Sequence, residues 1–351
     1  MTTPDPLTFQ TRLQEFIDAG AQAVALEVSS HALDQARVDG VDFDVAIFTN
    51  LTRDHLDYHQ TMDHYFASKA RLFTELLVQS RKSAKFGVIH FDDPWGEKLS
   101  KQASSVEVLT FGRRPGARYQ YEILQHGFEG ARFSIRDTAT AEVPASEFSI
   151  QMPGLHNVQN AVSAVLAARA LGIADRAIRE ALGALKGVAG RLERVPNDQG
   201  LNVFVDYAHT DDALRSILRS LDAIRQESGQ TARLITVFGC GGDRDKGKRP
   251  MMCRAALDHS DLVVVTSDNP RSEDPDAIID DIFAGARNEE RDKMERCVDR
   301  RQAIQLAISL AKPGDVVLIA GKGHEKTQTI GDRVFEFSDV SVTEQILRGD
   351  T

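Results

Sequence analysis

Hydrophobic residues in the first half of the chain fall into short runs, separated by segments with a helical pattern. Residues 23–28 and 45–48 are apolar runs, typical of parallel strands that are covered on both faces. The polar segment 29–40 between them is predicted to be a loop. Hydrophobic side chains recur at helical spacing in 63–79, which predicts a helix. Further strands are predicted at 86–91 and 106–111, an antiparallel patch at 119–149, and helices at 155–172 and 174–185.

The second half alternates strands and helices more regularly. Strands are predicted at 203–205, 234–238, 262–266 and 316–320, and helices at 211–225, 250–257, 276–286 and 300–310. This alternation predicts a doubly wound, Rossmann-like α/β domain. Segment 186–191 is the best linker candidate because it is rich in glycine and small residues. We therefore predict two domains, residues 1–190 and 191–351.

Polar loops that contain glycine or proline follow the predicted strands. In a doubly wound sheet, ligands bind outside the carboxyl ends of the strands. The segments that follow strands are 27–31, 49–59, 206–210, 239–249, 268–271 and 321–325. Six such loops are difficult to explain by packing alone, and they predict ligand-binding edges.

Composition narrows the classes of protein to which the chain can belong. Its 351 residues predict two domains, and a hydrophobic content of 42% excludes wholesale disorder. The longest apolar stretch, 161–168, is shorter than the roughly 18 residues that cross a bilayer, so no membrane partner is expected. A net charge of −10 argues against a nucleic-acid partner. Three cysteines without CxxC spacing support neither disulfides nor a zinc site. No signal peptide is visible at the start of the sequence, and we therefore expect a cytoplasmic location.

Eight strings in the sequence carry a family resemblance. They are EVSSHALDQARV (27–38), FTNLTRDHLDYH (48–59), YFASKARLF (65–73), GLHNVQN (154–160), DYAHT (206–210), GCGGDRDKGKRP (239–250), DNPRSEDP (268–275) and AGKGHE (320–325). In this order they resemble the Mur ligases, the ATP-dependent enzymes that build the peptide stem of bacterial cell-wall precursors. The resemblance is strongest to members that add the third residue to UDP-N-acetylmuramoyl-L-alanyl-D-glutamate. It implies a Mur-ligase central α/β domain followed by a Rossmann-like, amino-acid-binding C-terminal domain.

One element of the family pattern is missing from the sequence. The family has an N-terminal uridine-nucleotide domain, followed by a Gly-Lys-Thr phosphate loop after the first strand of the central domain. No GxxxxGK[ST] string occurs here, because loop 239–249 and Gly321-Lys322-Gly323 lack the hydroxyl after the lysine that would bind magnesium. We therefore expect an incomplete central domain without its first strand and phosphate loop, and a separate N-terminal fragment could act as a partner.

The resemblance implies ATP and Mg²⁺ as cofactors. In the family reaction ATP phosphorylates the D-glutamyl γ-carboxylate, the amine attacks the acyl phosphate, and magnesium neutralises charge. The implied magnesium ligands and catalytic residues are Glu27, His55 and Lys69, the lysine as a carbamate formed with CO₂. The residues alone leave open a hydrogen-bonded Glu27, a solvated Lys69, and a zinc cluster of Asp54, His55 and His59.

The resemblance also implies which residues contact the nucleotide substrates. The residues that match the family's muramoyl-peptide positions carry hydroxyl, amide and guanidinium groups, which can donate hydrogen bonds to carboxylate and phosphate groups. These are Thr2, Thr3, Ser29, Gln35 and Arg37. The ATP positions match Asn157, Arg191, Asp206 and His209. Asp206 could accept from a ribose hydroxyl, Arg191 could reach phosphate, and His209 could stack near adenine, whereas solvated loop residues are the alternative.

DNPR resembles the members that add meso-diaminopimelate rather than lysine. The implied amine site consists of Arg244, Asp268, Asn269, Pro270, Arg271, Gly321 and Glu325. Diaminopimelate carries a second carboxylate, which Arg271 could grip with help from Arg244, while Asp268 and Glu325 take the ammonium. Lysine would leave Arg271 unpaired, which can discriminate by ~10⁴. Asp268-Asn269-Pro270 also fits an ordinary turn.

These observations leave three functional hypotheses. The first is a ligase that adds meso-diaminopimelate to the UDP-N-acetylmuramoyl-dipeptide. The second is an inactive fragment that binds diaminopimelate or the precursor, or one half of a split ligase. The third is the folylpolyglutamate synthase class, which shares the domain logic but does not explain DNPR together with GKGHE.

Overall fold

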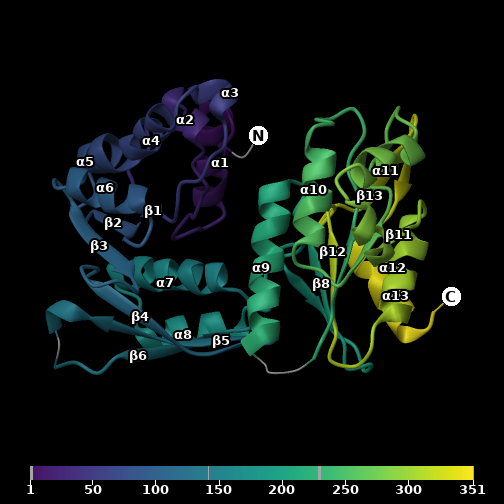
Figure 1. The fold of residues 1–351 in the computed structure, drawn as a ribbon. Coiled ribbons are helices and arrows are strands. Elements are labelled where there is room, and N and C mark those ends of the chain that lie inside the picture. The colour runs from purple at the N-terminus through teal and green to yellow at the C-terminus, as the bar shows by residue number, and fades with distance from the viewer. Residues whose placement is uncertain (1–2, 141, 228–230, 351) are drawn as a thin grey trace. The chain divides into compact units, whose positions relative to one another are not determined.

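The computed structural model describes residues 3–140, 142–227 and 231–350, which form two compact units (Figure 1). The first unit comprises Met1–Leu124, Arg132–Ser149 and His156–Leu182, and the second comprises Gln125–Ala131, Ile150–Leu155 and Gly183–Thr351. The last division, at 182/183, lies upstream of the predicted boundary at 190/191. In the described ranges, no helix has the length and apolar character needed to cross a membrane.

A six-stranded sheet organises the first unit, with the strands in chain order from β1 to β6. They are β1 (Val45–Phe48), β2 (Phe86–His90), β3 (Glu107–Gly112), β4 (Tyr119–Gly127), β5 (Gly130–Asp137) and β6 (Ser146–Ile150). The first three pair in parallel, and β4 also enters the sheet parallel to β3. The strands predicted at 45–48, 86–91 and 106–111 are confirmed. β1 lies at the edge of this sheet, and its Ile47 is exposed.

Ten helical segments belong to the first half of the described chain. They are α1 (Pro6–Asp18), α2 (Ser30–Asp34), α3 (Leu56–His59), α4 (Met62–Arg71), the π-helix η1 (Leu72–Leu76), α5 (Leu77–Gln79), α6 (Pro94–Gln102), the 3₁₀ helix η2 (Thr138–Thr140), α7 (Leu155–Ala170) and α8 (Asp175–Ala184). The helix predicted at 63–79 is confirmed as the continuous run α4–η1–α5. It packs on the sheet through buried side chains such as Phe73, whose ring centre lies 6.4 Å from that of Phe48. The helices predicted at 155–172 and 174–185 are also confirmed.

Two predictions near the start of the chain are wrong. Residues 23–28 form no strand, and Val24 and Glu27 are exposed. An apolar run becomes a strand only when another strand satisfies its backbone groups, and none of the described strands pairs with it. The segment 29–40 is not only a loop, because Ser29 caps the short helix α2 by accepting a hydrogen bond from Ala32 N at 3.2 Å.

The second unit contains a six-stranded sheet in the order β11-β10-β9-β12-β8-β7. The strands are β7 (Glu193–Val195), β8 (Asn202–Asp206), β9 (Leu234–Phe238), β10 (Leu262–Val265), β11 (Met294–Arg296) and β12 (Val316–Ala320). All neighbours pair in parallel except β7, which runs antiparallel to β8. The four strands predicted in this region are confirmed, and a parallel α/β sheet is the result.

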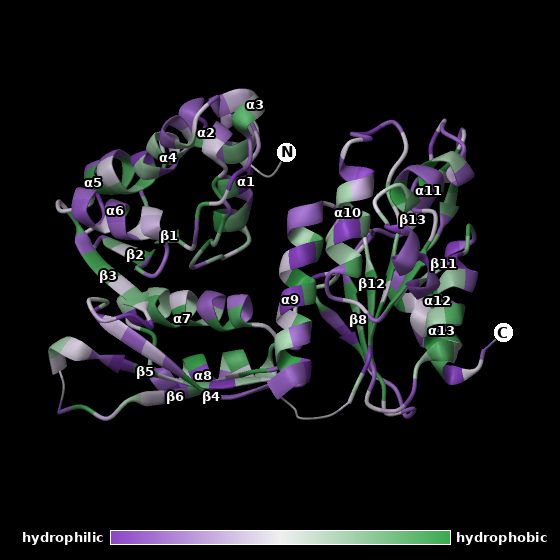
Figure 2. Ribbon diagram, in the orientation of Figure 1, coloured by the Kyte–Doolittle hydropathy of each residue, from purple (hydrophilic) through white to green (hydrophobic). Residues whose placement is uncertain are grey.

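Helices cover both faces of this second sheet (Figure 1). They are α9 (Asp211–Glu227), α10 (Lys248–Leu257), α11 (Pro275–Phe283), the 3₁₀ helix η3 (Asn288–Lys293), α12 (Arg300–Leu310) and α13 (Asp339–Arg348). Successive residues of β12 point to opposite faces: Leu318 joins the cluster under α9–α11, whereas Val317 and Ile319 join the cluster under α12 and α13. Figure 2 shows α9 in alternating hydrophilic and hydrophobic bands, as expected for a helix with one buried face.

A small hairpin follows β12 and was not predicted from the sequence. Its strands are β13 (Thr327–Ile330) and β14 (Arg333–Glu336), which pair only with each other apart from one bridge between Ile330 and Arg271. All four residues of β14 are exposed. A short strand that buries little apolar surface has no strong hydrophobic pattern, so periodicity does not reveal it.

Candidate functional site

Four loops follow the carboxyl ends of β8, β9, β10 and β12, at one edge of the second sheet. Glycines allow two of them to approach closely. An added Cβ at Gly239 would lie 2.3 Å from Thr266 O, and one at Gly242 would lie 1.8 Å from Pro270 O. Gly242 N also donates to Asn269 O at 2.9 Å. Because only glycine fits at these two positions, the loops after β9 and β10 hold a fixed arrangement.

Three of the predicted amine-site residues meet at one buried lysine. Lys322 Nζ donates to Asp268 Oδ1 at 3.3 Å, to Asn269 Oδ1 at 3.2 Å and to Glu325 Oε2 at 3.1 Å. Asn269 Nδ2 also donates to Glu325 Oε2 at 3.0 Å. Lys322 itself is fully buried. The structure therefore joins the loop after β10 to the loop after β12 through a network of charged and amide groups.

The backbone of Arg271 is anchored by the β13–β14 hairpin. Its amide donates to Thr329 O at 3.2 Å, and its carbonyl accepts from Gly331 N at 2.7 Å. Its φ of 51° lies in the left-handed region, which is unusual for arginine. Its side chain donates from Nη1 to Gly242 O at 2.8 Å. The guanidinium is therefore held in place before any ligand arrives.

The remaining predicted amine-site residues shape the same loops. Arg244 is exposed, and an added Cβ at Gly241 would lie 3.6 Å from Arg244 Cγ and 3.0 Å from Arg271 Nη1. Both guanidinium side chains therefore border the glycine turn after β9. Gly321 has a φ of 119°, and an added Cβ at this position would lie 3.3 Å from Asp268 Oδ2. The carbonyl of Pro270 accepts from Glu273 N at 3.0 Å and closes a turn.

Asp206 is buried at the end of β8, and backbone amides occupy both of its carboxylate oxygens. Leu192 N donates to Oδ2 at 2.6 Å, and Ala208 N donates to Oδ1 at 2.7 Å. Burial raises the pKa of Asp206, while these two hydrogen bonds act to lower it. In this structure Asp206 ties the segment after the linker to the β8 loop.

Arg191 and His209 gather around the ring of Tyr207. The Arg191 guanidinium carbon lies 5.3 Å from the ring centre, and the His209 ring centre lies 4.7 Å from it. His324 approaches the same ring at 5.1 Å. Asn157, the fourth predicted ATP residue, lies in the first turn of α7. Arg191, Tyr207, His209 and His324 of the second unit thus form one group of aromatic rings and a guanidinium.

Glu27, His55 and Lys69, the predicted magnesium residues, lie near one another in the first unit. Lys69 Nζ is 5.3 Å from the centre of the Tyr65 ring, and the His55 ring centre is 5.8 Å from it. Burial lowers the pKa of Lys69, while the nearby carboxylates of Glu27 and Asp54 act to raise it. A lowered pKa favours the neutral amine that carbamate formation requires.

His59 belongs to the core rather than to an open cluster. It is buried, its Nε2 lies 2.9 Å from Ser30 Oγ, and its ring stacks on Tyr65 at 5.1 Å. Desolvation lowers its pKa. Within the described ranges, no three His, Cys, Asp or Glu side chains are arranged to hold a metal ion. The magnesium site of Glu27, His55 and a carbamate on Lys69 that the family resemblance implies therefore stays a prediction.

The predicted muramoyl-peptide residues form a connected group beside them. Thr3 is buried, and its Oγ1 donates to Glu27 O at 3.0 Å and accepts from Ser29 N at 3.1 Å. Arg37 Nη1 donates to Thr3 O at 3.0 Å, and Arg37 Nε donates to Gln35 Oε1 at 3.0 Å. Thr2 lies outside the described residues.

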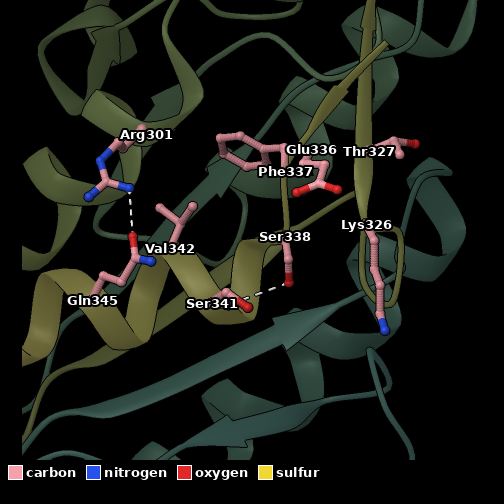
Figure 3. A pocket seen from close by; sticks show the side chains of 9 residues that line it. All are labelled: Arg301, Lys326, Thr327, Glu336, Phe337, Ser338, Ser341, Val342 and Gln345. Atoms are coloured by element: carbon pink, nitrogen blue, oxygen red, sulfur yellow. Dashed lines mark hydrogen bonds between the residues drawn. The ribbon is translucent and has the colours of Figure 1, made fainter.

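A pocket of about 750 Å³ lies between α12, the β13–β14 hairpin and α13 (Figure 3). Its lining residues are Arg301, Lys326, Thr327, Glu336, Phe337, Ser338, Ser341, Val342 and Gln345. Figure 3 shows Arg301 directed toward Gln345, to which it donates a hydrogen bond of 2.9 Å. None of the predicted site residues lines this pocket, so it does not extend the candidate site.

Comparison with known proteins decides the family. A model of the Mur ligase middle domain matches residues 1–168, and a model of the Mur ligase glutamate ligase domain matches residues 190–323. A curated protein of Geobacter metallireducens is 46% identical over 353 residues, which cover 96% of this chain and 67% of that protein. The chain belongs to the Mur ligase family. It is therefore an enzyme of a ligase family, and the predicted fold class is confirmed.

Other relatives agree with this assignment. A protein of Syntrophomonas wolfei is 42% identical and covers 99% of this chain and 68% of its own. Both curated relatives are named UDP-N-acetylmuramoyl-L-alanyl-D-glutamate–2,6-diaminopimelate ligase, as is a solved structure with a TM-score of 0.71, 36% identity, and coverage of 99% of this chain and 69% of that one. The chain spans about two thirds of the length of these relatives. A folylpolyglutamate synthase of Mycobacterium tuberculosis shares the fold, with a TM-score of 0.59 and 21% identity over 81% of this chain and 62% of that one.

In this Mur ligase, Lys69→Arg is expected to lower the ligase rate about 10- to 100-fold. The guanidinium keeps the charge of an unmodified lysine but cannot form a carbamate, so any role of the carbamate is lost. The measurement is the steady-state rate as a function of Mg²⁺ concentration. Lys98→Arg is the matched control, because Lys98 is an exposed lysine of the same unit that pairs with Asp63. Wild-type magnesium dependence in Lys69→Arg would exclude the carbamate.

Sequence reasoning missed Lys322 and Tyr207 in this Mur ligase. A lysine is normally expected on the surface, and a tyrosine after a strand is normally packing. One signal was available for Lys322, since it stands between two glycines, Gly321 and Gly323, whose φ angles of 119° and 52° disfavour other residues. The two glycine conformations fix the backbone on either side of Lys322, so its side chain has a more defined position than a surface lysine.

Proposed function

We propose that the protein adds meso-diaminopimelate to UDP-N-acetylmuramoyl-L-alanyl-D-glutamate, with ATP as the energy source and an acyl phosphate as the intermediate. In this proposal residues 1–190 form a partial central domain, which handles ATP and the muramoyl-peptide. Residues 191–351 form the amino-acid-binding domain.

The observation that carries the proposal is the amine site at the edge of the second sheet. Arg271 is fixed through its backbone and through Nη1, and Asp268 of the same loop is joined to Glu325 of the loop after β12 through Lys322. A site with one guanidinium and two carboxylates complements an amino acid that carries an extra carboxylate as well as ammonium groups. Relatives that are 42–46% identical carry the name of that activity.

The residues of this chain account for binding and orientation. Arg271, with Arg244 beside the same turn, would hold the distal carboxylate of diaminopimelate, and Glu325 would receive an ammonium group. Fixing both ends of the amino acid orients its reacting amine toward the acyl phosphate. Arg191, beside Tyr207, would neutralise ATP phosphate charge, and Asp206 would keep that loop in place through its two backbone hydrogen bonds.

Glu27, His55 and Lys69 would hold magnesium, the lysine as its carbamate. Bound Mg²⁺ would neutralise the charge that builds up on the transferred phosphoryl group. The reduced pKa of Lys69 supports this assignment, because CO₂ reacts with the neutral amine.

The test is phosphate release by the 351-residue chain with ATP, Mg²⁺, UDP-N-acetylmuramoyl-L-Ala-D-Glu and meso-diaminopimelate. Release should require all four components, and lysine should replace diaminopimelate at least ~10⁴-fold less efficiently. Equal release with either amine would refute the proposed substrate. Absence of release, with diaminopimelate binding retained in calorimetry, would refute the proposed catalysis by this chain.

A further inference from the structure

Lys322 is fully buried, although lysine is seldom buried without partners. Its Nζ carries three hydrogens, and three side-chain oxygens accept them, from Asp268, Asn269 and Glu325. Two of these partners lie more than 50 positions away in the sequence, in a different loop. All three N–H donors of the ammonium are therefore hydrogen-bonded, and these bonds join the loop after β10 to the loop after β12.

The partners of Lys322 are residues of the proposed amine site. Asp268 and Glu325 both place a carboxylate oxygen within 3.3 Å of Nζ. Without a cation between them, two carboxylates this close would repel each other in a poorly solvated setting. Lys322 is therefore what allows the two negative groups to face one ligand.

We propose that Lys322 is a positioning residue for the amino-acid substrate. It holds Asp268, Asn269 and Glu325 in the arrangement that receives the ammonium group, and it does so without touching the substrate. This inference rests on the proposed function, because it assigns a role within the same amine site.

Burial distinguishes positioning from direct contact. The side chain of Lys322 has no exposed surface, and all three of its donors are used. The side chain of Glu325 is 33% exposed, and the hydrogen bonds from Asn269 and Lys322 both end on Oε2, which leaves Oε1 available to a ligand. Glu325 can therefore reach a ligand, whereas Lys322 can act only through its neighbours.

A second buried cation, Arg300, binds the backbone at the same edge of the sheet. Arg300 donates from Nη2 to Ala320 O at 3.0 Å and from Nη1 to Ser267 O at 3.5 Å. Ala320 and Ser267 are the residues directly before Gly321 and Asp268. The ends of β10 and β12 are therefore tied together beneath Lys322, so the loops that it joins start from a common base.

The test compares Lys322→Met with Lys326→Met in the full chain. Methionine is unbranched and one atom shorter than lysine, and it removes the charge and all three donors. Lys326 is an exposed lysine four positions later that lines the pocket beside α13 and makes none of these contacts (Figure 3). Lys322→Met should raise the KM for meso-diaminopimelate about 100-fold and leave the KM for ATP unchanged. Lys326→Met should change neither value.

Lys322→Arg is expected to recover part of the loss, since it restores the charge with different geometry. Thermal melts and calorimetric titration with meso-diaminopimelate accompany the kinetics. If Lys322→Met does not fold, Lys322→Gln retains two N–H donors without the charge and is expected to show the same selective loss. A uniform rise in every KM, or no rise at all, would overturn the positioning role. Failure of the proposed function would be seen separately, as a wild-type chain that does not prefer diaminopimelate over lysine.

Discussion

Arg271→Ala is expected to lower kcat/KM for meso-diaminopimelate about 1,000-fold and to leave the slow reaction with lysine unchanged. Gly242 O holds the guanidinium through Nη1, and the hairpin holds the backbone of Arg271, so in the proposed site the guanidinium would meet the distal carboxylate without reorganisation. Removing one partner of such a charged pair costs several kcal/mol, and every 1.4 kcal/mol is tenfold. Free lysine, as the alternative substrate, has no distal carboxylate, so the variant removes no contact from it. The preference for diaminopimelate should therefore fall from ~10⁴ to about tenfold.

Two variants control for effects on the fold. Arg271→Lys keeps the positive charge but cannot form a bidentate pair, so it should fall between wild type and alanine. Arg296→Ala removes an arginine of the same unit that pairs with Asp276 and Asp280 of α11, none of which is a predicted site residue, and should leave both reactions unchanged. The measurement is steady-state kinetics with each amine as the variable substrate. An equal loss with both amines would show that Arg271 supports the loop rather than reading the substrate.

The sequence predicted the buried strands of the second unit because burial on two faces demands continuous apolar residues. Strands such as Leu234–Phe238 and Val316–Ala320 therefore have the bounds that their hydrophobic runs suggest. The same rule failed at 23–28, where the run is apolar but no described strand pairs with it. Hydrophobicity determines which residues can be buried, whereas strand formation also depends on a partner elsewhere in the chain. The β13–β14 hairpin was missed for the opposite reason, since it buries little apolar surface.

The sequence predicted which residues belong to the candidate amine site, but not the hydrogen bonds that join them. Asp268, Asn269 and Arg271 stand out as a polar string at a strand end, and the family resemblance adds Glu325. No local pattern shows that Lys322 bridges Asp268 to Glu325, because that contact depends on β10 and β12 ending at the same edge, with β9 between them. Asp206 stands out by its position at a strand end, and the contact with ATP that the family resemblance implies for it stays a prediction. The structure adds that each of its carboxylate oxygens accepts a hydrogen bond from a backbone amide, which no local sequence pattern shows.

Asp339→Ala is expected to reduce the free energy of unfolding of the second unit by about 3–5 kcal/mol. Asp339 and Arg300 form an ion pair in which both side chains are fully buried, with N–O distances of 2.7 Å. Removing the carboxylate leaves the guanidinium uncompensated in a site without solvent. The pair also joins the start of α12 to the start of α13, so its loss weakens the packing of both helices on the sheet.

The measurement is urea unfolding followed by two signals. The single tryptophan, Trp95, belongs to the first unit, so its fluorescence should keep the wild-type transition, while far-ultraviolet circular dichroism should show an earlier loss of structure. Glu344→Ala is the matched control on the same helix, because its pair with Arg348 is exposed and should contribute less than about 1 kcal/mol.

The double variant Arg300→Met with Asp339→Leu separates charge from hydrogen bonding in this pair. Replacing both members by apolar side chains of similar volume removes the unpaired charge, and buried pairs treated in this way often regain their stability. We expect the double variant to recover most of the loss seen in Asp339→Ala. If it is as unstable as the single variant, the loss of the hydrogen bonds from Arg300 to Ala320 O and Ser267 O would cancel the gain from removing the unpaired charge. In that case Arg300 would stabilise the unit also by holding the ends of β10 and β12, which carry loops of the proposed amine site.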